Sequence, residues 1–144
     1  MQLTHFTDYS LRVVLYLAVK KESASVSEIA NYYGISRHHM VKVVHNLAKL
    51  NLVKTTRGKG GGVTLAMAPE DVNIGEVVDK TEPNFHLVGC FDPACNKCPI
   101  LPGCLLRNVL EEALQNFKAT LARYTLADLL RDEKLLQELI QRAA

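Results

Sequence analysis

Four cysteines lie within fifteen consecutive residues, and the chain has no others. They are Cys90, Cys95, Cys98 and Cys104, so four, two and five residues separate them. Thiolates are the soft ligands that iron, zinc and copper select. Prolines and glycines interrupt the same segment, so we expect a turn-rich loop on which several thiolates converge. The segment is therefore predicted to bind a metal centre.

Several kinds of centre are compatible with this loop. A structural zinc site would be closed by thiolates alone, an iron–sulfur cluster would be exposed and reactive, and a dithiol switch would need no metal. Zinc ribbons pair their cysteines in C-x2-C units, and the irregular spacing here lacks that symmetry. The spacing therefore favours an iron–sulfur cluster slightly over zinc, and a dithiol switch is the weakest candidate.

The bulk composition is that of a globular protein. Apolar residues make up 48% of the 144 residues and charged ones 22%, which fits a single compact protomer. The longest strongly apolar run, residues 13–19, is too short to span a membrane, and the first residues form no signal peptide. We therefore expect a cytoplasmic protein, in which clustered thiols stay reduced and bind metals or react rather than form disulfides.

The net charge of +2 hides an asymmetry along the chain. Residues 1–65 contain nine basic and three acidic side chains, a net charge of +6, and the remaining residues contain eight and twelve, a net charge of −4. A basic N-terminal module is expected to bind a polyanion. A randomly uneven surface is the alternative that charge alone leaves open.

Residues 26–50 have the pattern of two helices joined by a tight turn. Ser27 is expected to begin a short helix that runs through Tyr33, and Gly34 supplies the left-handed residue that ends it. Ser36 then caps a second helix with one apolar stripe and a basic outer face. The stripe consists of Met40, Val43, Val44, Leu47 and Leu50. This pattern indicates a helix-turn-helix; an ordinary amphipathic helix with a solvated charged face is the alternative.

A β-hairpin wing is predicted directly after these helices. Residues 52–57 and 63–65 have strand character, and the glycine-rich residues 58–62 form the tip between them. Basic residues at such a tip reach phosphates or a minor groove while the recognition helix lies in the major groove. A nucleotide-binding loop is not expected, because the motif G-x-x-x-x-G-K-S/T is absent.

The predicted DNA contacts fall into two groups. The first turns of a recognition helix usually reach base edges, and Arg37, His38 and His39 lie there. Of these, we expect Arg37 and His39 to read bases. Phosphate contacts are expected from the basic side chains Lys42, Lys49, Arg57 and Lys59. The predicted partner is therefore double-stranded DNA.

Further helices are predicted after the wing. Asn73 and Glu76 have the spacing of a helix cap, and the short helix they open runs to about Thr81. The longest helical pattern follows Cys104, and its apolar stripe consists of Leu106, Val109, Leu110, Ala113, Leu114, Phe117 and Leu121. A matching helix of a second subunit is the natural cover for this stripe, which predicts a homodimer. Packing on its own protomer is the alternative.

The predicted fold is mainly α with a small β-hairpin wing: a winged helix-turn-helix plus a long dimerisation helix. Residues 125–128 are expected to cap a last amphipathic helix. The expected domains are a DNA-binding module at 1–67, a connecting helix and linker at 68–89, a cluster-binding loop at 90–104, and the dimerisation and C-terminal helices at 105–144. A dimer presents two recognition helices about one DNA turn apart, which matches a palindromic operator.

Short motifs are spread over residues 1–130: M-Q-L-T with F-T-D-Y-S-L-R, Y-G-I-S, H-M-V-K, R-G-K-G-G-G, N-I-G and Y-T-L-A-D-L. Together they resemble the nitric-oxide-sensing repressors within the Rrf family of winged-helix regulators. The resemblance implies a homodimeric repressor with an iron–sulfur cluster, usually 4Fe-4S and alternatively 2Fe-2S. It further implies that reaction of the cluster with nitric oxide releases the operator DNA.

The resemblance also implies a ligand set of cysteines and one carboxylate. Cys90, Cys98 and Cys104 match the thiolate ligands, and Asp8 matches the carboxylate, which in the family reaches over from the partner subunit. Cys95 departs from the family pattern. It either replaces Cys98, substitutes for Asp8, or takes no part in binding.

Other functions are weighed against this one. Iron–sulfur assembly regulators of the same family take a histidine three residues after the last cysteine, where this chain has Arg107. This departure leaves a general redox sensor with a 2Fe-2S cluster as the alternative. An enzyme is not expected, because no nucleophile–base pair, phosphate loop or paired acid–base carboxylates are evident. A zinc-stabilised adaptor without a DNA function is the remaining alternative.

Overall fold

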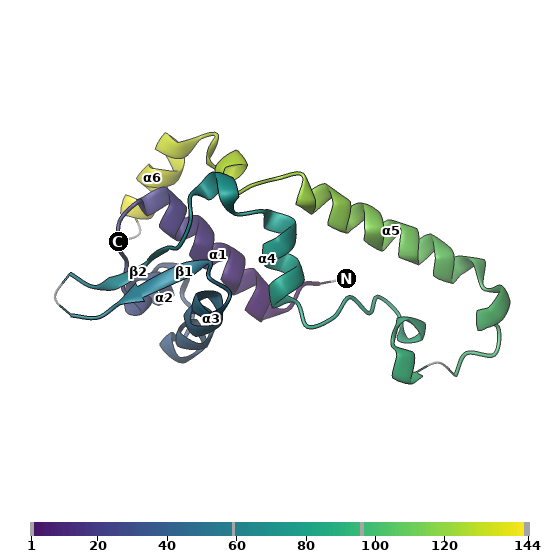
Figure 1. The fold of residues 1–144 in the computed structure, drawn as a ribbon. Helices are drawn as coiled ribbons and strands as arrows, with labels where there is room; N and C mark the ends of the chain where they lie inside the picture. The colour runs from purple at the N-terminus through teal and green to yellow at the C-terminus, as the bar shows by residue number, and fades with distance from the viewer. Residues whose placement is uncertain (1, 59, 96, 143–144) are drawn as a thin grey trace.

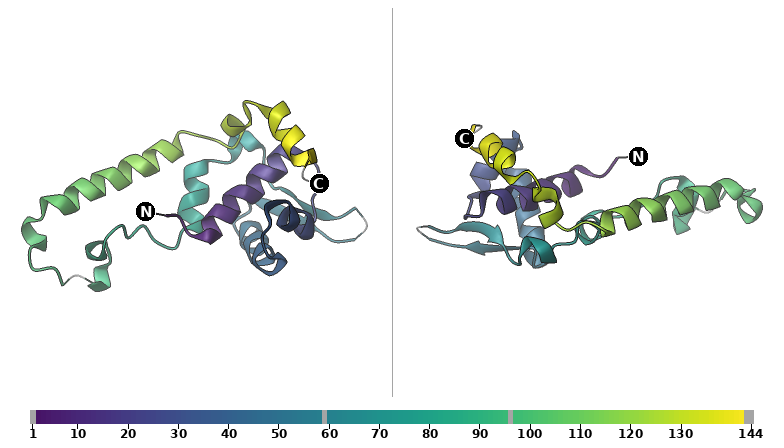
Figure 2. Two further views of the ribbon diagram at one scale, coloured as in Figure 1. Left: turned by 180° about the vertical axis from the view of Figure 1, so that it is seen from behind. Right: turned by 90° about the horizontal axis from the view of Figure 1, so that it is seen from above.

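The computed structural model describes residues 2–58, 60–95 and 97–142. Figure 1 shows a body from which one long helix and a loop extend as an arm. The body contains the helices α1 to α4 and α6 and a two-stranded sheet, and the arm contains α5 and the segment that leads to it. Both views in Figure 2 show the arm standing away from the body. The cysteine segment therefore lies on the arm.

The first helix, α1 (His5–Lys20), runs through the centre of the body. Thr4 caps its N-terminus, because the Thr4 hydroxyl accepts a hydrogen bond from Thr7 N at 3.3 Å. The helix ends at Lys21, which adopts the left-handed conformation with φ 60°. Its buried residues are Thr7, Ser10, Val13, Val14, Tyr16, Leu17, Ala18 and Val19. Burial on successive turns makes α1 the centre against which the DNA-reading helices pack.

The predicted helix-turn-helix is formed by α2 (Val26–Tyr33) and α3 (Arg37–Lys49). Gly34 lies at φ 63°, the left-handed conformation expected of the residue that ends α2. The predicted cap of α3 is also confirmed, because the Ser36 hydroxyl accepts a hydrogen bond from His39 N. The turn residues therefore set the angle between the two helices as the sequence predicts.

The predicted start of α2 at Ser27 is wrong. Ser25 is the N-cap: its hydroxyl accepts from Glu28 N at 3.0 Å, and the Glu28 carboxylate accepts from Ser25 N at 3.4 Å. This reciprocal pair is a capping box, which requires an acid three residues after the cap. Ser27 lacks that acid and instead lies inside the first turn, where its hydroxyl contacts Arg37.

The predicted wing is an antiparallel hairpin of β1 (Val53–Thr56) and β2 (Gly62–Leu65). Val63 also pairs with Ala24, through hydrogen bonds of 3.0 Å and 2.8 Å between their backbone groups. A Cβ atom at Gly62 would lie 2.9 Å from Ala24 O, which leaves no room for a larger residue. The hairpin is therefore tied to the segment between α1 and α2.

The arm meets the body where α4 (Ile74–Thr81) packs against the end of α5 (Leu105–Ala122). The predicted cap of α4 is confirmed, and the Asn73 side chain also donates a hydrogen bond to Ala122 O at 2.7 Å. A Cβ atom at Gly75 would lie 2.9 Å from Ala122 Cα. Only a glycine lets the two backbones approach this closely.

The apolar stripe of α5 is only partly covered by its own protomer. Leu114 is buried, whereas Leu105, Leu106 and Val109 near the cysteines are 73%, 65% and 53% exposed. The alternative in which the stripe packs on its own protomer therefore holds for the part of α5 next to α4. The part next to the cysteine loop leaves its apolar side chains uncovered.

The last predicted helix begins later than expected. Thr125 and Asp128 do form the predicted cap, with Thr125 N donating to Asp128 Oδ2 at 2.8 Å. The capped element is a short 3-10 helix, Ala127–Leu130, and α6 (Glu133–Arg142) follows it. The prediction of one helix is wrong because the chain turns again before α6, which then returns to pack beside α1.

The core of the body combines side chains from α1, α2, α3, the wing and α4. Its largest fully buried side chains include Tyr16, Ile29, Met40, Leu47 and Leu126. This packing fixes α3 with one side in the core and the other in solvent. Among the described helices, none has the length and apolar character needed to cross a membrane.

Candidate DNA-binding face and cysteine arm

The recognition helix α3 turns its basic side to solvent. Met40, Val43, Val44 and Leu47 are buried on its inner side. On the outer side the exposed residues include Arg37, His38, His39, Lys42 and Lys49. The orientation is the one that contact with a DNA groove requires.

Arg37 is oriented by the neighbouring helix. Its Nε donates a hydrogen bond to Ser27 Oγ at 3.0 Å, within the first turn of α2. Beside it lies a cleft of about 280 Å³ whose lining includes Ser25, Ser27, Arg37 and Thr56. The hydroxyl groups of such a cleft suit a phosphate oxygen. Ser27 and Thr56 are therefore candidate contacts that the sequence pattern does not single out, since it predicts only that Ser27 begins a helix.

The tip of the wing is sharply turned. Gly58 and Gly60 have φ angles of 98° and 83°, a conformation that glycine adopts without strain. Arg57 is exposed at the start of this tip, where a long cation reaches a phosphate backbone. Lys59, the other predicted tip contact, lies outside the described residues.

The cysteine loop consists of short 3-10 helices joined by turns. Cys90 lies in the first of these, the backbone of Cys95 ends the second, and Cys104 directly precedes α5. Cys90, Cys98 and Cys104 are free thiols; Cys98 is exposed and the other two are partly buried. The side chain of Cys95 lies outside the described atoms.

The loop does not assemble a coordination sphere within one protomer. Across the described residues, no three side chains of His, Cys, Asp or Glu lie close enough to hold a metal ion. The backbone hydrogen bonds of the loop are local, as in Leu101 N to Cys98 O at 3.2 Å and Cys104 N to Leu101 O at 3.3 Å. Such short-range bonds hold turns together without fixing distances between the thiols.

Arg107 indicates that an anionic group fits this loop. Its Nε is buried and has no hydrogen-bond partner within the described part of the chain. Its guanidinium lies 5.9 Å from the centre of the Phe91 ring, beside the turn that carries Cys90. A buried N–H without a partner is costly, and a thiolate-rich metal centre supplies acceptors. The donor types and this unpaired N–H therefore both fit an iron–sulfur cluster.

Asp8 lies in the first turn of α1 and pairs with Arg12. Arg12 Nε lies 2.9 Å from Asp8 Oδ1, and Arg12 Nη2 lies 2.9 Å from Asp8 Oδ2. The hydrogen bond to Asp8 raises the pKa of Arg12 above its ordinary value. In the single protomer Asp8 is therefore occupied by an ion pair rather than placed among the cysteines.

The same Arg12 connects α1 to the end of α2. Its guanidinium lies 5.6 Å from the centre of the Tyr33 ring, and the Tyr33 hydroxyl donates to Arg12 O at 3.2 Å. Burial, supported by the neighbouring Tyr32, raises the pKa of Tyr33 to about 12, so its hydroxyl keeps its proton at neutral pH. Asp8, Arg12 and Tyr33 thus form a continuous path toward the helix-turn-helix.

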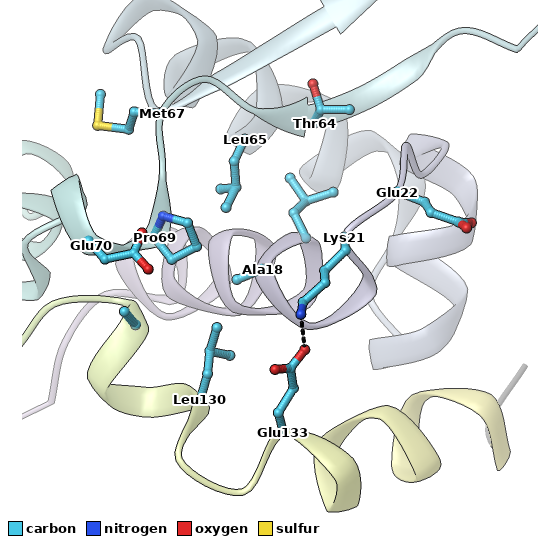
Figure 3. A pocket seen from close by; sticks show the side chains of 12 residues that line it. Ala18, Lys21, Glu22, Thr64, Leu65, Met67, Pro69, Glu70, Leu130 and Glu133 are labelled. Carbon is cyan, nitrogen blue, oxygen red and sulfur yellow. Dashed lines mark ion pairs between the residues drawn. The ribbon is translucent and has the colours of Figure 1, made fainter.

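A cleft of about 600 Å³ lies on the body between α1, β2 and the C-terminal helices. In Figure 3 the side chains of Ala18, Leu65 and Leu130 line it, and Lys21 reaches Glu133 across its edge at 2.5 Å. This ion pair ties the end of α1 to α6. Among the predicted DNA and metal residues that the structure describes, none lines this cleft.

A buried central helix, an exposed basic recognition helix and a hairpin wing define a winged helix-turn-helix regulator. The cysteine arm is an addition to that class. The chain belongs to the Rrf2 family: the model of this family, described as an iron-dependent transcriptional regulator, matches residues 3–132.

Curated relatives match nearly the whole chain. It is 48% identical over 143 residues to the HTH-type transcriptional regulator NsrR of Bacillus subtilis (strain 168), covering 98% of each chain. It is 49% identical over 143 residues to the protein of the same name from Halalkalibacterium halodurans, again covering 98% of each. These relatives confirm the resemblance that the short motifs predict.

Solved structures confirm the predicted fold class. The structure of T. potens IscR has a TM-score of 0.73 at 25% identity and covers 95% of this chain and 91% of that one. The structure of CymR, described as the global cysteine regulator of B. subtilis, has a TM-score of 0.65 at 24% identity and covers 90% and 95%. The second similarity supports the fold alone.

Proposed function

We propose that this protein is a homodimeric repressor that binds an operator in double-stranded DNA and senses nitric oxide through an iron–sulfur cluster, of the 4Fe-4S type. The observation that carries the proposal is the cysteine arm, with the free thiols Cys90, Cys98 and Cys104 on a winged-helix body. Near-full-length similarity to regulators named NsrR supports it. A catalytic role is not part of the proposal.

Cys90, Cys98 and Cys104 are assigned as the thiolate ligands, with Asp8 of the partner subunit as the fourth ligand. When bound, the cluster supplies a centre that reacts with nitric oxide. A carboxylate oxygen is a poor match for a cluster otherwise held by thiolates, so Asp8 is the ligand most easily displaced. Release of Asp8 changes a contact between the subunits.

The residues around Asp8 explain how its release reaches the DNA-reading helices. Once free, Asp8 forms the observed ion pair with Arg12, and Arg12 contacts Tyr33 at the end of α2. Tyr33 is followed by the turn that leads into α3. Asp8 therefore has two alternative partners, and the choice between them biases the position of α3. Thorough switching requires the two states to differ by about 5 kcal/mol in DNA affinity.

The uncovered part of α5 supports the dimer. Leu105, Leu106 and Val109 are more than half exposed, and an apolar patch on a long helix is a surface for a second copy. The patch begins directly after Cys104. A partner subunit that covers this patch would lie beside the cysteine loop. The proposed ligand set requires Asp8 of the partner subunit at this place.

The exposed side of α3 and the wing are proposed to contact DNA. Arg37 and His39 read base edges, with His38 beside them in the same turn. Phosphates are contacted by Lys42, Lys49, Arg57 and Lys59. The hydroxyls of Ser27 and Thr56 add to the phosphate site beside Arg37.

An iron–sulfur or general redox regulator of the IscR type, with a 2Fe-2S cluster, is the second candidate. The similarity to the structure of T. potens IscR favours it. Arg107 opposes it, because a guanidinium stands where that type takes a histidine ligand, and a guanidinium does not coordinate iron.

Anaerobic purification tests the proposal. We expect a coloured protein with equal amounts of iron and sulfide, whose visible absorption bleaches when nitric oxide is added. Zinc without iron or sulfide would support a structural zinc site instead. A cluster that ignores nitric oxide but responds to oxidants would favour the redox regulator.

A further inference from the structure

Glu82 connects the end of α4 to the beginning of α1. Its carboxylate accepts hydrogen bonds from Thr4 N at 3.1 Å, Thr4 Oγ at 3.0 Å and Thr7 Oγ at 2.6 Å. Thr7 is fully buried. We call these three residues the α1 clamp. Bonds from several donors to one carboxylate are charge-assisted and stronger than neutral hydrogen bonds.

The clamp replaces a local interaction by a distant one. In an ordinary capping box, a Glu or Gln three residues after the cap accepts from the N–H of the cap residue. In α1 that position is Thr7, and the carboxylate that accepts from Thr4 N belongs to Glu82, 78 residues away. A local acid would have capped the helix equally well. The distant one additionally fixes where the first turn of α1 lies relative to the end of α4.

The two segments joined by the clamp lead to ligands of the two proposed metal sites of the dimer, because Asp8 completes the site of the partner subunit and the cysteine arm forms the site of its own protomer. Asp8 directly follows Thr7, and its N–H donates to Thr4 O at 3.0 Å. Glu82 is the C-cap of α4, and the chain after it runs to Cys90. The clamp is therefore the point at which the Asp8 turn and the start of the cysteine arm are joined.

Packing around the clamp is incomplete. A cleft of about 370 Å³ lies beside Glu82, and its lining includes Leu3, Phe85, Leu110 and Phe117. These side chains come from the N-terminal segment, the chain after α4, and α5. Because this space is open, few packing contacts join α1 to the end of α4 there. The hydrogen bonds of Glu82 therefore contribute more to holding the two segments together than they would in a filled core.

We propose that Glu82 is a positioning residue, which holds the Asp8 turn of one protomer at a fixed place relative to the cysteine arm of the same protomer and so couples the state of the two clusters of the dimer to DNA affinity. This inference rests on the proposed function. Glu82 binds neither metal nor DNA. Without it the cysteines keep the cluster, but displacement of Asp8 is transmitted less completely to α3.

The chain offers matched variants. Glu82→Gln removes the negative charge, and its amide group cannot accept all the bonds that the carboxylate accepts. Thr7→Val removes one donor and keeps the shape of the side chain, whereas Thr7→Ser keeps the donor. Glu76→Gln is the control, because Glu76 is an exposed acid on the same helix that pairs only with Lys80 among the described residues.

Hydrogen exchange of the apoprotein tests the geometry without the cluster. We expect residues 3–8 and 83–89 to exchange about tenfold faster in Glu82→Gln and Thr7→Val, because a charge-assisted bond is lost. Residues 37–49 should be unchanged, as should every segment in Thr7→Ser and Glu76→Gln. Unchanged exchange in both clamp variants would contradict the claim that the hydrogen bonds of Glu82 hold the start of α1 to the end of α4.

The ratio of operator affinity between cluster-loaded protein and apoprotein tests the coupling. We expect normal iron and sulfide in all variants, a ratio reduced about tenfold in Glu82→Gln and Thr7→Val, and a wild-type ratio in Thr7→Ser. A wild-type ratio in both clamp variants would overturn the positioning role of Glu82 while leaving the proposed function intact. Loss of the cluster in these variants would also overturn the positioning role. A ratio of one in the wild-type protein would reject the proposed function itself and the coupling with it.

Discussion

Arg12 and Asp8 form a two-point ion pair one turn apart on α1, with both N–O distances at 2.9 Å. Both side chains of the pair are partly exposed to solvent, so its contribution to folding is small. The pair matters because of the two residues that form it. Asp8 is the carboxylate proposed to bind the partner's cluster, and Arg12 contacts Tyr33 next to the helix-turn-helix. Under the proposed function, Arg12 is the partner that Asp8 takes once it leaves the cluster.

Removal of Arg12 should weaken switching more than folding. In Arg12→Ala the released Asp8 has no local partner and Tyr33 loses its cation, so the affinities of cluster-loaded and cluster-free protein for the operator should differ less. The free energy of unfolding should fall by no more than about 1 kcal/mol. Fluorescence anisotropy with an operator duplex measures the first and urea unfolding the second. Lys80→Ala removes a pair of the same spacing on α4 and should leave the affinity difference unchanged.

Iron content should distinguish the cysteines. Cys90→Ala, Cys98→Ala and Cys104→Ala should each lose the cluster, because each removes an assigned ligand. Cys95→Ala should retain it. Iron and sulfide assays of the four proteins, purified without oxygen, check the assignment. Loss of iron in Cys95→Ala with retention in Cys98→Ala would exchange the roles of these two residues.

The DNA-contact residues should fall into two measurable groups. Lys42→Ala should weaken binding to all sequences alike and reduce the salt dependence of log affinity by about one unit. Arg37→Ala should cost about 1–3 kcal/mol on the operator and relax the preference for one base pair. Binding titrations at several salt concentrations, on operator and unrelated duplexes, separate the two effects. Lys134→Ala on the distant helix α6 is the control, and an equal loss there would indicate non-specific charge.

The contact between α4 and α5 should not tolerate a side chain at Gly75. In Gly75→Ala the new methyl group meets Ala122 backbone atoms at 2.9 Å, and forcing the helices apart should cost about 1–3 kcal/mol. Urea unfolding gives the change in free energy. Gly89→Ala is the matched control, since a Cβ atom there has no neighbour within 4 Å. Equal stability of both variants would contradict the close approach.

Glu28 should make stability depend on acid pH. Its burial opposes ionisation, but hydrogen bonds from Lys20 and Tyr16 outweigh that effect and lower the pKa of Glu28 below its ordinary value of 4.5. A lowered pKa stabilises the fold above the unfolded value, and this stabilisation disappears as pH falls through the folded value. Urea unfolding between pH 7 and pH ~3 should therefore show a steeper acid loss in wild type than in Glu28→Gln. The exposed Glu22→Gln should follow wild type.

Local patterns in the sequence predict much of this fold. Ser36, Gly34 and Asn73 act as the expected helix caps and stops, because such signals depend on residues within one turn of each other. The apolar stripe of α3 is buried at Met40, Val43, Val44 and Leu47, as its period predicts, whereas Leu50 is half-buried at the C-cap. The pair of Asp8 with Arg12 has the spacing of neighbours on a helix and was open to the same reasoning.

The remaining features depend on contacts between distant segments. Glu82 contacts Thr4 only because α4 packs beside α1. The sequence near Thr4 contains no pattern that predicts this contact. The division of the α5 stripe into a covered and an open part likewise depends on where Gly75 lets α4 approach. The coordination sphere is the extreme case, since its proposed carboxylate belongs to another chain.

The state of the iron–sulfur cluster on the cysteine arm is proposed to control the affinity of the winged helices for DNA. The most direct measurement is the operator affinity of one anaerobic sample before and after stoichiometric nitric oxide. We expect a fall of about 10⁴-fold together with bleaching of the cluster. An unchanged affinity in a sample whose cluster has fully reacted would contradict it.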